Sequence, residues 1–263
     1  MTVQEVPPTF TSPFKRLQYG SGHVYVDDLG RPVQSVTSIL RDGMPKPALI
    51  NWAGETTAAY AVDHWAELEQ MGVATRYKTI LNARWNTTRT ASIRGTAIHQ
   101  AAEAIGKGEP YAIPADSTAQ VEAYRRFLDD WRVEPIAIER VVGHTTFGYA
   151  GTFDILALVN GEPYLLDIKT NASGVFPETA LQLAAYLHAD WSEHEATLKR
   201  LGGARTGVVW LRPDGGYELL PVDAGEESFR AFLAAKDLAS WSKANDGVIG
   251  SALALPTTVK VTA

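Results

Sequence analysis

The segment GTFDILALVNGEPYLLDIKT, residues 151–170, constrains the fold of this chain more than any other. It contains two apolar runs separated by Asn160-Gly161, a dipeptide typical of a two-residue hairpin turn. Such a turn fixes the register of both strands, and counting outward from it places Asp154 directly opposite Asp167. Lys169 follows two residues later, so we expect it on the same face of its strand as Asp167.

Two facing carboxylates inside apolar strands repel each other and are costly to remove from water. A bound hard cation relieves this cost, because Mg²⁺ and Mn²⁺ prefer carboxylate oxygens, water and phosphate as ligands. A lysine beside the pair is suited to orient or deprotonate a metal-bound water, or to neutralise developing charge. The alternative is a polar hairpin rim on which Asp167 and Lys169 form a solvated ion pair.

Helical and strand-like patterns alternate along the rest of the chain, which predicts an α/β fold. We expect a mainly helical N-terminal region with a β-hairpin over residues 1–93 and a core over residues 94–263. The expected strands are 23–26, 33–39, 136–142, 151–159, 163–170, 206–212 and 217–222. The expected helices are 48–70, 96–107, one from 117, 178–189 and 226–243.

Composition excludes several classes of protein. The chain has no cysteine, which rules out a disulfide scaffold, a thiolate-held iron–sulfur cluster and a cysteine nucleophile. No apolar run approaches the ~20 residues that span a bilayer, and the N-terminus lacks the pattern of a secretion signal. We therefore expect a cytoplasmic protein without a membrane partner. A formal net charge of −6 argues against a protein that coats nucleic acid indiscriminately, but allows local action on it.

Four short motifs occur in a fixed order: RGTAIH at residues 94–99, GTFD at 151–154, DIKT at 167–170 and QLAAY at 182–186. Together they resemble the PD-(D/E)XK nuclease superfamily, in particular its RecB-like branch, which includes CRISPR-associated and phage recombination exonucleases. The chain departs from that branch because it lacks the cysteines that hold an iron–sulfur cluster in many members. It has no proline beside Asp154, as is common in this branch. It also lacks a phosphate-loop motif, so unwinding of DNA would need a partner.

The resemblance implies a restriction-endonuclease-like core, in which a central mixed sheet with an antiparallel three-strand meander is flanked by helices. It implies a Mg²⁺ or Mn²⁺ ion held by His99, Asp154, Asp167 and the Ile168 carbonyl. Lys169 would position or activate the attacking water. Gln182 and Tyr186, four residues apart on one helix, would brace the lysine or contact the DNA backbone. Two acids, Glu103 and Glu139, are candidates for a second metal or its surroundings.

The segment from residue 76 to residue 94 carries five basic residues and no acidic one. It is either a solvated helix surface or a surface that contacts the DNA backbone, with Trp85 or Tyr77 stacking on a base. The candidates for DNA binding are Arg76, Lys78, Arg84, Trp85, Arg89 and Arg94.

The sequence therefore predicts a metal-dependent deoxyribonuclease, foremost an exonuclease that acts on single- or double-stranded ends in recombination, repair or replication. A recombinase, a helicase or a single-strand-binding protein would be its partner, in a bacterial or phage-infected cell. Three alternatives stay open: a non-catalytic nucleic-acid-binding or assembly subunit, a structure-specific endonuclease, and a hydrolase of another phosphoester.

Overall fold

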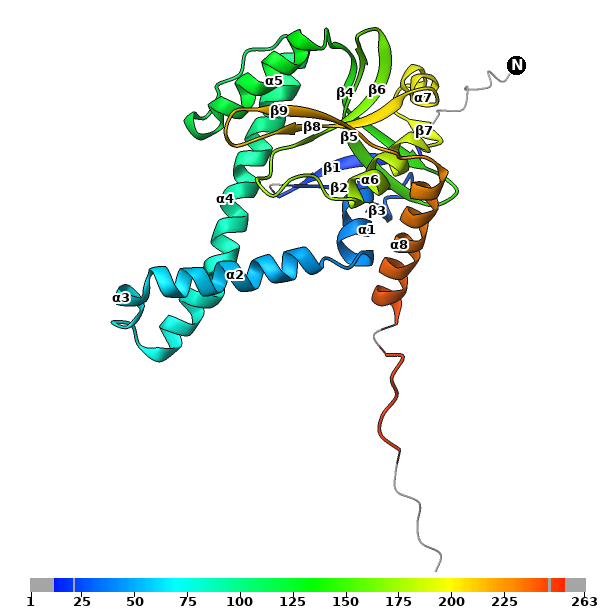
Figure 1. The fold of residues 1–263 in the computed structure, drawn as a ribbon. Coiled ribbons are helices and arrows are strands. Elements are labelled where there is room, and N and C mark those ends of the chain that lie inside the picture. Colours follow the sequence, from blue (N-terminus) through cyan, green and yellow to red (C-terminus); the bar gives the residue numbers. More distant parts are fainter. Residues whose placement is uncertain (1–11, 21, 246, 254–263) are drawn as a thin grey trace, which may run out of the picture.

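The computed structural model describes residues 12–20, 22–245 and 247–253. The chain is an α/β protein in which a mixed, open sheet of nine strands is flanked by helices (Figure 1). This confirms the predicted fold class. The N-terminal residues, over which the sequence predicts no secretion signal, lie outside the described part. Within the described part, no helix is long and apolar enough to cross a membrane.

The elements follow one another along the chain with these bounds. The strands are β1 (Lys15–Tyr19), β2 (Gly22–Val26), β3 (Pro32–Ser35), β4 (Glu134–His144), β5 (Tyr149–Val159), β6 (Glu162–Lys169), β7 (Trp191–Ser192), β8 (Arg205–Leu211) and β9 (Tyr217–Pro221). The α-helices are α1 (Val36–Gly43), α2 (Pro47–Asp63), α3 (Trp65–Leu68), α4 (Val73–Lys107), α5 (Thr118–Asp130), α6 (Glu178–Leu187), α7 (Glu195–Leu201) and α8 (Glu226–Ala244), and a 3₁₀ turn, η1 (Ala115–Ser117), precedes α5.

The hairpin of β5 and β6 has the predicted register. Its pairs run from Val159 opposite Glu162 to Ile155 opposite Leu166. Asn160 and Gly161 both have positive φ values, 49° and 83°, as a two-residue primed turn requires. β4 pairs antiparallel with β5 to complete the three-strand meander, while β6 pairs in parallel with β8. The meander therefore forms the centre of the sheet.

Each face of the sheet is covered by helices. The second half of α4 and α5 pack on one face, where Ile98, Tyr124 and Phe127 meet Ile155 and Leu166. α1, α6 and α8 pack on the other face in a separate core. That second core includes Val36, Phe153, Leu165, Leu183 and Phe232. Burial on both sides holds β5 and β6 firmly in place, because the two strands are clamped between two cores.

Three predicted elements have wrong bounds. The helix predicted over residues 48–70 is divided at His64 into α2 and α3, and α3 ends at Leu68. The segment 33–39 is a strand only as far as Ser35, since the Ser35 side chain accepts a hydrogen bond from the Ser38 N–H and starts α1. The helix predicted to begin near Thr96 is the second half of α4, which runs without a break from Val73. The proposed division between residues 93 and 94 therefore falls inside a helix.

α2, α3 and the first half of α4 extend away from the sheet as a helical arm (Figure 1). None of the 17 residues of α2, all of which are described, is buried. Large apolar side chains of the arm are exposed, among them Ile50, Val62, Tyr77 and Trp85. Its environment thus differs sharply from that of the sheet.

Candidate metal centre

Asp154 lies at a gap between two partners of β5. One edge of β5 pairs with β4 along its length, and the other edge pairs with β3 at residues 149–150 and with β6 at residues 155–159. Residues 151–154 lie between these two partners. The predicted ladder pair of Asp154 with Asp167 is therefore absent, although the register is correct. Instead, the Asp154 carboxylate accepts a hydrogen bond of 2.6 Å from the Ile168 N–H.

Three side chains from three elements meet at this point. His99 of α4, Glu139 of β4 and Asp154 of β5 each offer a ligand atom, and these atoms lie within 4.8 Å of one another. The His99 Nδ1 atom is 3.5 Å from Asp154 Oδ1. The three residues line a cavity of about 10 Å³, close to the smallest space that holds one water molecule. Ile168 also lines this cavity.

Glu139 occupies an unusual backbone conformation. Its φ is 50°, although it lies inside a strand, where this left-handed region is costly for a residue other than glycine. Strain of this kind, about 1–3 kcal/mol, persists only where the surrounding structure enforces it, and it clusters at functional sites. In the pairing of β4 with β5, Ile138 faces Ile155 and Arg140 faces Phe153. Glu139, which lies between these two pairs, is therefore beside Asp154.

The charges of the three side chains are strongly coupled. Burial disfavours the imidazolium of His99, but the carboxylates of Asp154, Asp167 and Glu139, with Asp154 foremost, together outweigh it and raise the pKa of His99 to about 9. Burial, with the charge of Asp154, raises the pKa of Glu139 to about 7. Burial also opposes ionisation of Asp154, yet His99 and the Ile168 N–H hold its pKa below the usual range.

Asp167, Lys169, Gln182 and Tyr186 form a second network beside the first. Gln182 donates to Asp167 Oδ1 at 2.7 Å and accepts from the Lys169 ammonium at 3.2 Å. Lys169 Nζ also forms an ion pair of 2.8 Å with Asp167 Oδ2. A longer contact of 3.5 Å joins Gln182 to the Tyr186 hydroxyl. The helix α6 therefore braces both charged side chains of β6.

The buried carboxyl of Asp167 is held by Gln182 at Oδ1 and by the Lys169 ammonium at Oδ2. The residue is only 2% exposed. Burial raises its pKa despite the nearby Lys169 charge. Burial also works against the charge of Lys169, but Asp167 outweighs it and the pKa of Lys169 is raised.

Tyr186 has a packing role that the sequence did not reveal. Its ring lies so close to Gly151 that a Cβ at this glycine would approach Tyr186 Cε1 to 2.6 Å. The side chain is 2% exposed, so its position is set within the core. This explains why glycine precedes Asp154 by three residues: a larger side chain would push α6, and with it Gln182, away from β5.

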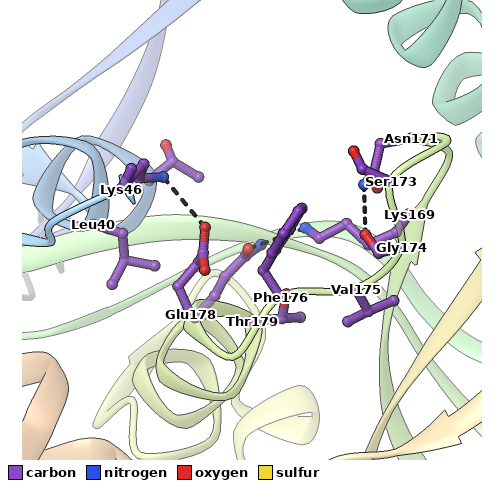
Figure 2. A pocket seen from close by; sticks show the side chains of 12 residues that line it. Leu40, Lys46, Lys169, Asn171, Ser173, Gly174, Val175, Phe176, Glu178 and Thr179 are labelled. Carbon is purple, nitrogen blue, oxygen red and sulfur yellow. Dashed lines mark hydrogen bonds and ion pairs between the residues drawn. The ribbon is translucent and has the colours of Figure 1, made fainter. Parts of the chain in front are cut away.

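An open pocket of about 350 Å³ adjoins Lys169 and Gln182 (Figure 2). The loop after β6 lines it with Asn171, Ser173 and Phe176, among others. On the opposite side, Lys46 before α2 lies 3.5 Å from Glu178 of α6. The sequence patterns did not single out these residues, because the pocket joins segments that are far apart in the chain.

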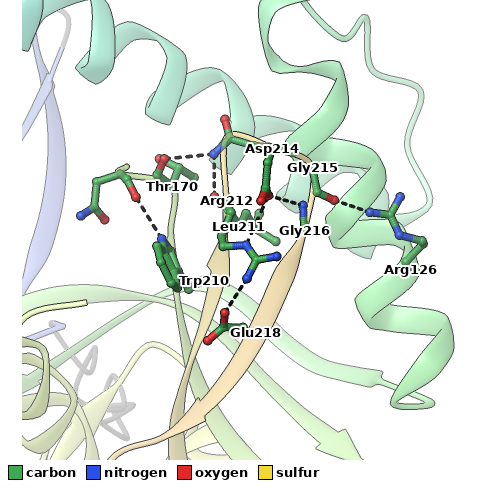
Figure 3. Close-up of polar contacts among 11 residues, drawn as sticks. Arg126, Thr170, Trp210, Leu211, Arg212, Asp214, Gly215, Gly216 and Glu218 are labelled. Atoms are coloured by element: carbon green, nitrogen blue, oxygen red, sulfur yellow. Dashed lines mark hydrogen bonds and ion pairs between the residues drawn. The ribbon is translucent and has the colours of Figure 1, made fainter. Parts of the chain in front are cut away.

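The end of β6 is anchored by side-chain hydrogen bonds (Figure 3). Gln120 of α5 is 3% exposed and donates to the carbonyls of Thr170 and Leu211. The Trp210 indole N–H donates to the Asn171 carbonyl at 2.9 Å. These contacts fix the chain just beyond Lys169 and so limit the positions that its ammonium can reach.

The remaining predicted residues are spread along α4. Glu103 lines the small cavity but is also joined to Lys107 one turn later. Arg76 donates to the carbonyls of Leu68, Glu69 and Met71, which close the end of α3. The other DNA-binding candidates lie farther along the helix. Lys78, Trp85 and Arg89 are exposed, while Arg84 and Arg94 are half-buried.

Comparison with protein-family models finds no match for this chain, and comparison with curated protein sequences finds none either. The chemistry of the site therefore rests on its own residues. The possible ligand atoms are nitrogen and oxygen. The carboxyls of Glu139 and Asp154 lie close together, and the cavity between the three side chains is small. The group of His99, Glu139 and Asp154 could hold a metal ion. An iron–sulfur cluster held by thiolates is excluded, because the chain has no cysteine.

Proposed function

We propose that this chain is a divalent-metal-dependent deoxyribonuclease of the RecB-like PD-(D/E)XK type, and foremost an exonuclease. One observation carries the proposal: His99, Glu139 and Asp154 surround a small cavity at the point where Ile168 joins β6 to Asp154. Asp167 and Lys169 flank Ile168 in β6, and Gln182 of α6 joins them to each other. Acid, base and cation-binding groups are thus combined as hydrolysis of a phosphodiester requires.

His99, Glu139 and Asp154 would hold the Mg²⁺ or Mn²⁺ ion, with Asp167 as a further candidate ligand. When bound, such an ion supplies positive charge at a phosphoryl oxygen and lowers the pKa of a bound water. Lys169 is held by Gln182 at the rim of the pocket, where its ammonium neutralises charge that develops on the phosphate or orients the attacking water. Burial of Asp167 and the ring of Tyr186 keep this arrangement rigid.

The same proposal includes the biological setting implied by the resemblance. The enzyme would act on DNA ends in recombination, repair or replication, in the cytoplasm of a bacterial or phage-infected cell. A recombinase, a helicase or a single-strand-binding protein would be its partner. Processive unwinding of DNA would need such a partner, because the sequence contains no phosphate-loop motif.

The decisive experiment incubates the purified chain with linear and circular DNA, single- and double-stranded, in Mg²⁺, Mn²⁺ or EDTA. We expect linear DNA to be degraded with either metal and to stay intact in EDTA. Asp154→Asn should lower the rate by about a thousandfold or more, because several kcal/mol of transition-state stabilisation is lost. Asp237→Asn, an exposed acid on α8, is the matched control and should cleave like the wild type.

Each other outcome has a defined meaning. Cleavage of circular DNA would replace the exonuclease with an endonuclease. Binding of DNA without cleavage in any metal would favour the non-catalytic subunit. Hydrolysis of bis(p-nitrophenyl) phosphate without any action on DNA would indicate a different phosphoester substrate. Cleavage that persists in Asp154→Asn would overturn the assigned centre.

A further inference from the structure

One face of α4 runs from the exposed arm to the candidate metal centre. Positions spaced by three, four or seven residues share a face of an α-helix. This spacing connects a row of residues that we call the α4 stripe. The stripe consists of Lys78, Trp85, Arg89, Ser92 and Thr96, and its next member is His99. Because α4 is one uninterrupted helix, the stripe and the imidazole of His99 belong to the same side of it.

The stripe is accessible and positively charged. All five members are exposed, and Trp85 has 58% of its surface exposed. Between Glu69 and Glu103 the chain contains no acidic residue. A helix rises 1.5 Å per residue, so the distance from Lys78 to His99 is about 30 Å. A polyanion could therefore follow the stripe as far as His99 without passing a carboxylate of α4, since the first one, Glu103, lines the metal-centre cavity itself.

The opposite side of α4 is occupied by the protein itself. Ala83 is 4% exposed, and Arg76 binds three carbonyls at the end of α3. The Arg84 guanidinium lies over the ring of Trp85, 4.9 Å from the ring centroid. Such a cation–π contact restricts the indole, although Trp85 stays largely exposed. The structure thus separates the basic residues of the arm into two groups, with only Lys78 and Arg89 on the stripe.

We propose that the α4 stripe binds a single strand of DNA and leads it to the metal centre. This rests on the proposed nuclease function and deepens it by naming the form of the substrate. The charge pattern selects a polyanion, while the hydroxyls of Ser92 and Thr96 suit hydrogen bonds to phosphate oxygens. Trp85 selects the single strand, because an aromatic ring can stack on a base only where that base is unpaired.

The test measures binding separately from cleavage. Fluorescein-labelled oligo(dT) of 30 nucleotides is titrated in EDTA at several NaCl concentrations, with fluorescence anisotropy as the readout. Lys78→Ala/Arg89→Ala should weaken binding at least about tenfold and reduce the slope of log K against log salt by about 1.4, which corresponds to two lost phosphate contacts on a single strand. Trp85→Ala should weaken binding about 5- to 100-fold with no change of that slope.

Arg200→Ala/Arg230→Ala is the matched control, since it removes the same charge from exposed positions on α7 and α8. We expect it to bind oligo(dT) like the wild type. Equal weakening by the control and the stripe variant would show that only net charge matters and would overturn the proposal. A blunt 30-base-pair duplex that binds as tightly as oligo(dT), and with the same sensitivity to Trp85→Ala, would overturn the choice of a single strand.

Failure of the stripe and failure of the nuclease assignment are distinguishable. If wild-type protein degrades DNA but the stripe variants bind oligo(dT) normally, the path along α4 is wrong and the enzyme assignment stands. If the stripe variants lose binding but no metal supports cleavage, the stripe is a DNA-binding surface of a non-catalytic protein.

Discussion

The two halves of α4 place the same backbone structure in opposite environments. From Ile98 onward the helix buries a row of apolar residues against the sheet, including Ala101 and Ala102. From Val73 to Arg94, Ala83 is its one buried residue. The second half reads as an amphipathic helix packed on a core, whereas the first half is dominated by Arg, Thr and Asn.

This difference indicates a division of tasks. Chemistry requires side chains held to within a fraction of an ångström, which only the packed half supplies. His99 is delivered by this half, next to strained Glu139 and buried Asp167. A surface that binds a polyanion tolerates more freedom, because charge acts over several ångströms. The helix links the two without a hinge.

The largest expected effect tests whether the chemistry is confined to the region that the second half of α4 packs against, which includes Lys169 of β6. Lys169→Ala should lower kcat for DNA cleavage about 100- to 1000-fold, because a cation held at the reacting phosphate is lost. Mn²⁺ binding should change little, since Lys169 is not a ligand. Lys78→Ala on the arm should instead raise KM and leave kcat nearly unchanged. Steady-state kinetics on a linear substrate separate the two, and a large loss of kcat in Lys78→Ala would erase the distinction.

A matched pair of isoleucines tests the contrast in packing on a single helix. Ile98 is fully buried, whereas Ile93, only five residues away, is 61% exposed. Ile98→Ala should lower the free energy of unfolding by about 2–5 kcal/mol, because it leaves a cavity in the core. Ile93→Ala should change it by no more than about 0.5 kcal/mol. Urea denaturation followed by circular dichroism gives both values, and similar losses would show that the arm is packed in solution.

The pairing of β5 with β6 could be predicted from the sequence, but the pairing of β5 with β3 could not. Asn160-Gly161 fixed the register of β5 and β6, because a two-residue turn leaves no freedom of pairing. The gap beside Asp154 depends on a parallel pairing of Ser35 with Ala150, which no local pattern encodes. Because of this gap, the Asp154 carboxylate accepts a hydrogen bond from the Ile168 N–H instead of pairing with Asp167.

Gly95 misled the prediction of α4 for a related reason. A glycine followed by Thr96 resembles a helix start. In the structure this glycine lies in mid-helix, and a Cβ there would come within 3.3 Å of the Thr170 hydroxyl. It is therefore a position of close approach between α4 and the end of β6. A single sequence does not distinguish a glycine that ends a helix from one that lets a strand come near.

The pH dependence of metal binding is a smaller expected effect, and it concerns only the metal centre beside the packed half of α4. His99 must be neutral to bind a cation, and the pKa of its metal-free form is raised to about 9. Below pH 9 each ion bound must displace a proton, so affinity should rise about tenfold per pH unit. Below about pH 7 Glu139 is protonated as well, and the dependence should steepen.

Mn²⁺ affinity measured by electron paramagnetic resonance between pH 6 and pH 8 gives this slope. His99→Asn removes one displaced proton and should flatten the profile, while Glu139 still contributes near pH 7. An affinity that does not depend on pH in the wild type would place the ion away from His99 and Glu139.

The smallest effect concerns the internal order of the arm. The Arg76 guanidinium donates to the Leu68, Glu69 and Met71 carbonyls and lies 5.5 Å from the Trp65 ring centroid. Arg76→Ala should cost about 1–2 kcal/mol of local stability, since three carbonyls lose a charged donor but remain near solvent. The global free energy of unfolding should stay nearly constant, because the core of the sheet is untouched.

Hydrogen exchange is the appropriate measurement: residues 65–76 should exchange faster while residues 98–105 keep their protection. If both segments lost protection together, the two halves of α4 would unfold as one unit, and the contrast between them would be one of exposure rather than of stability.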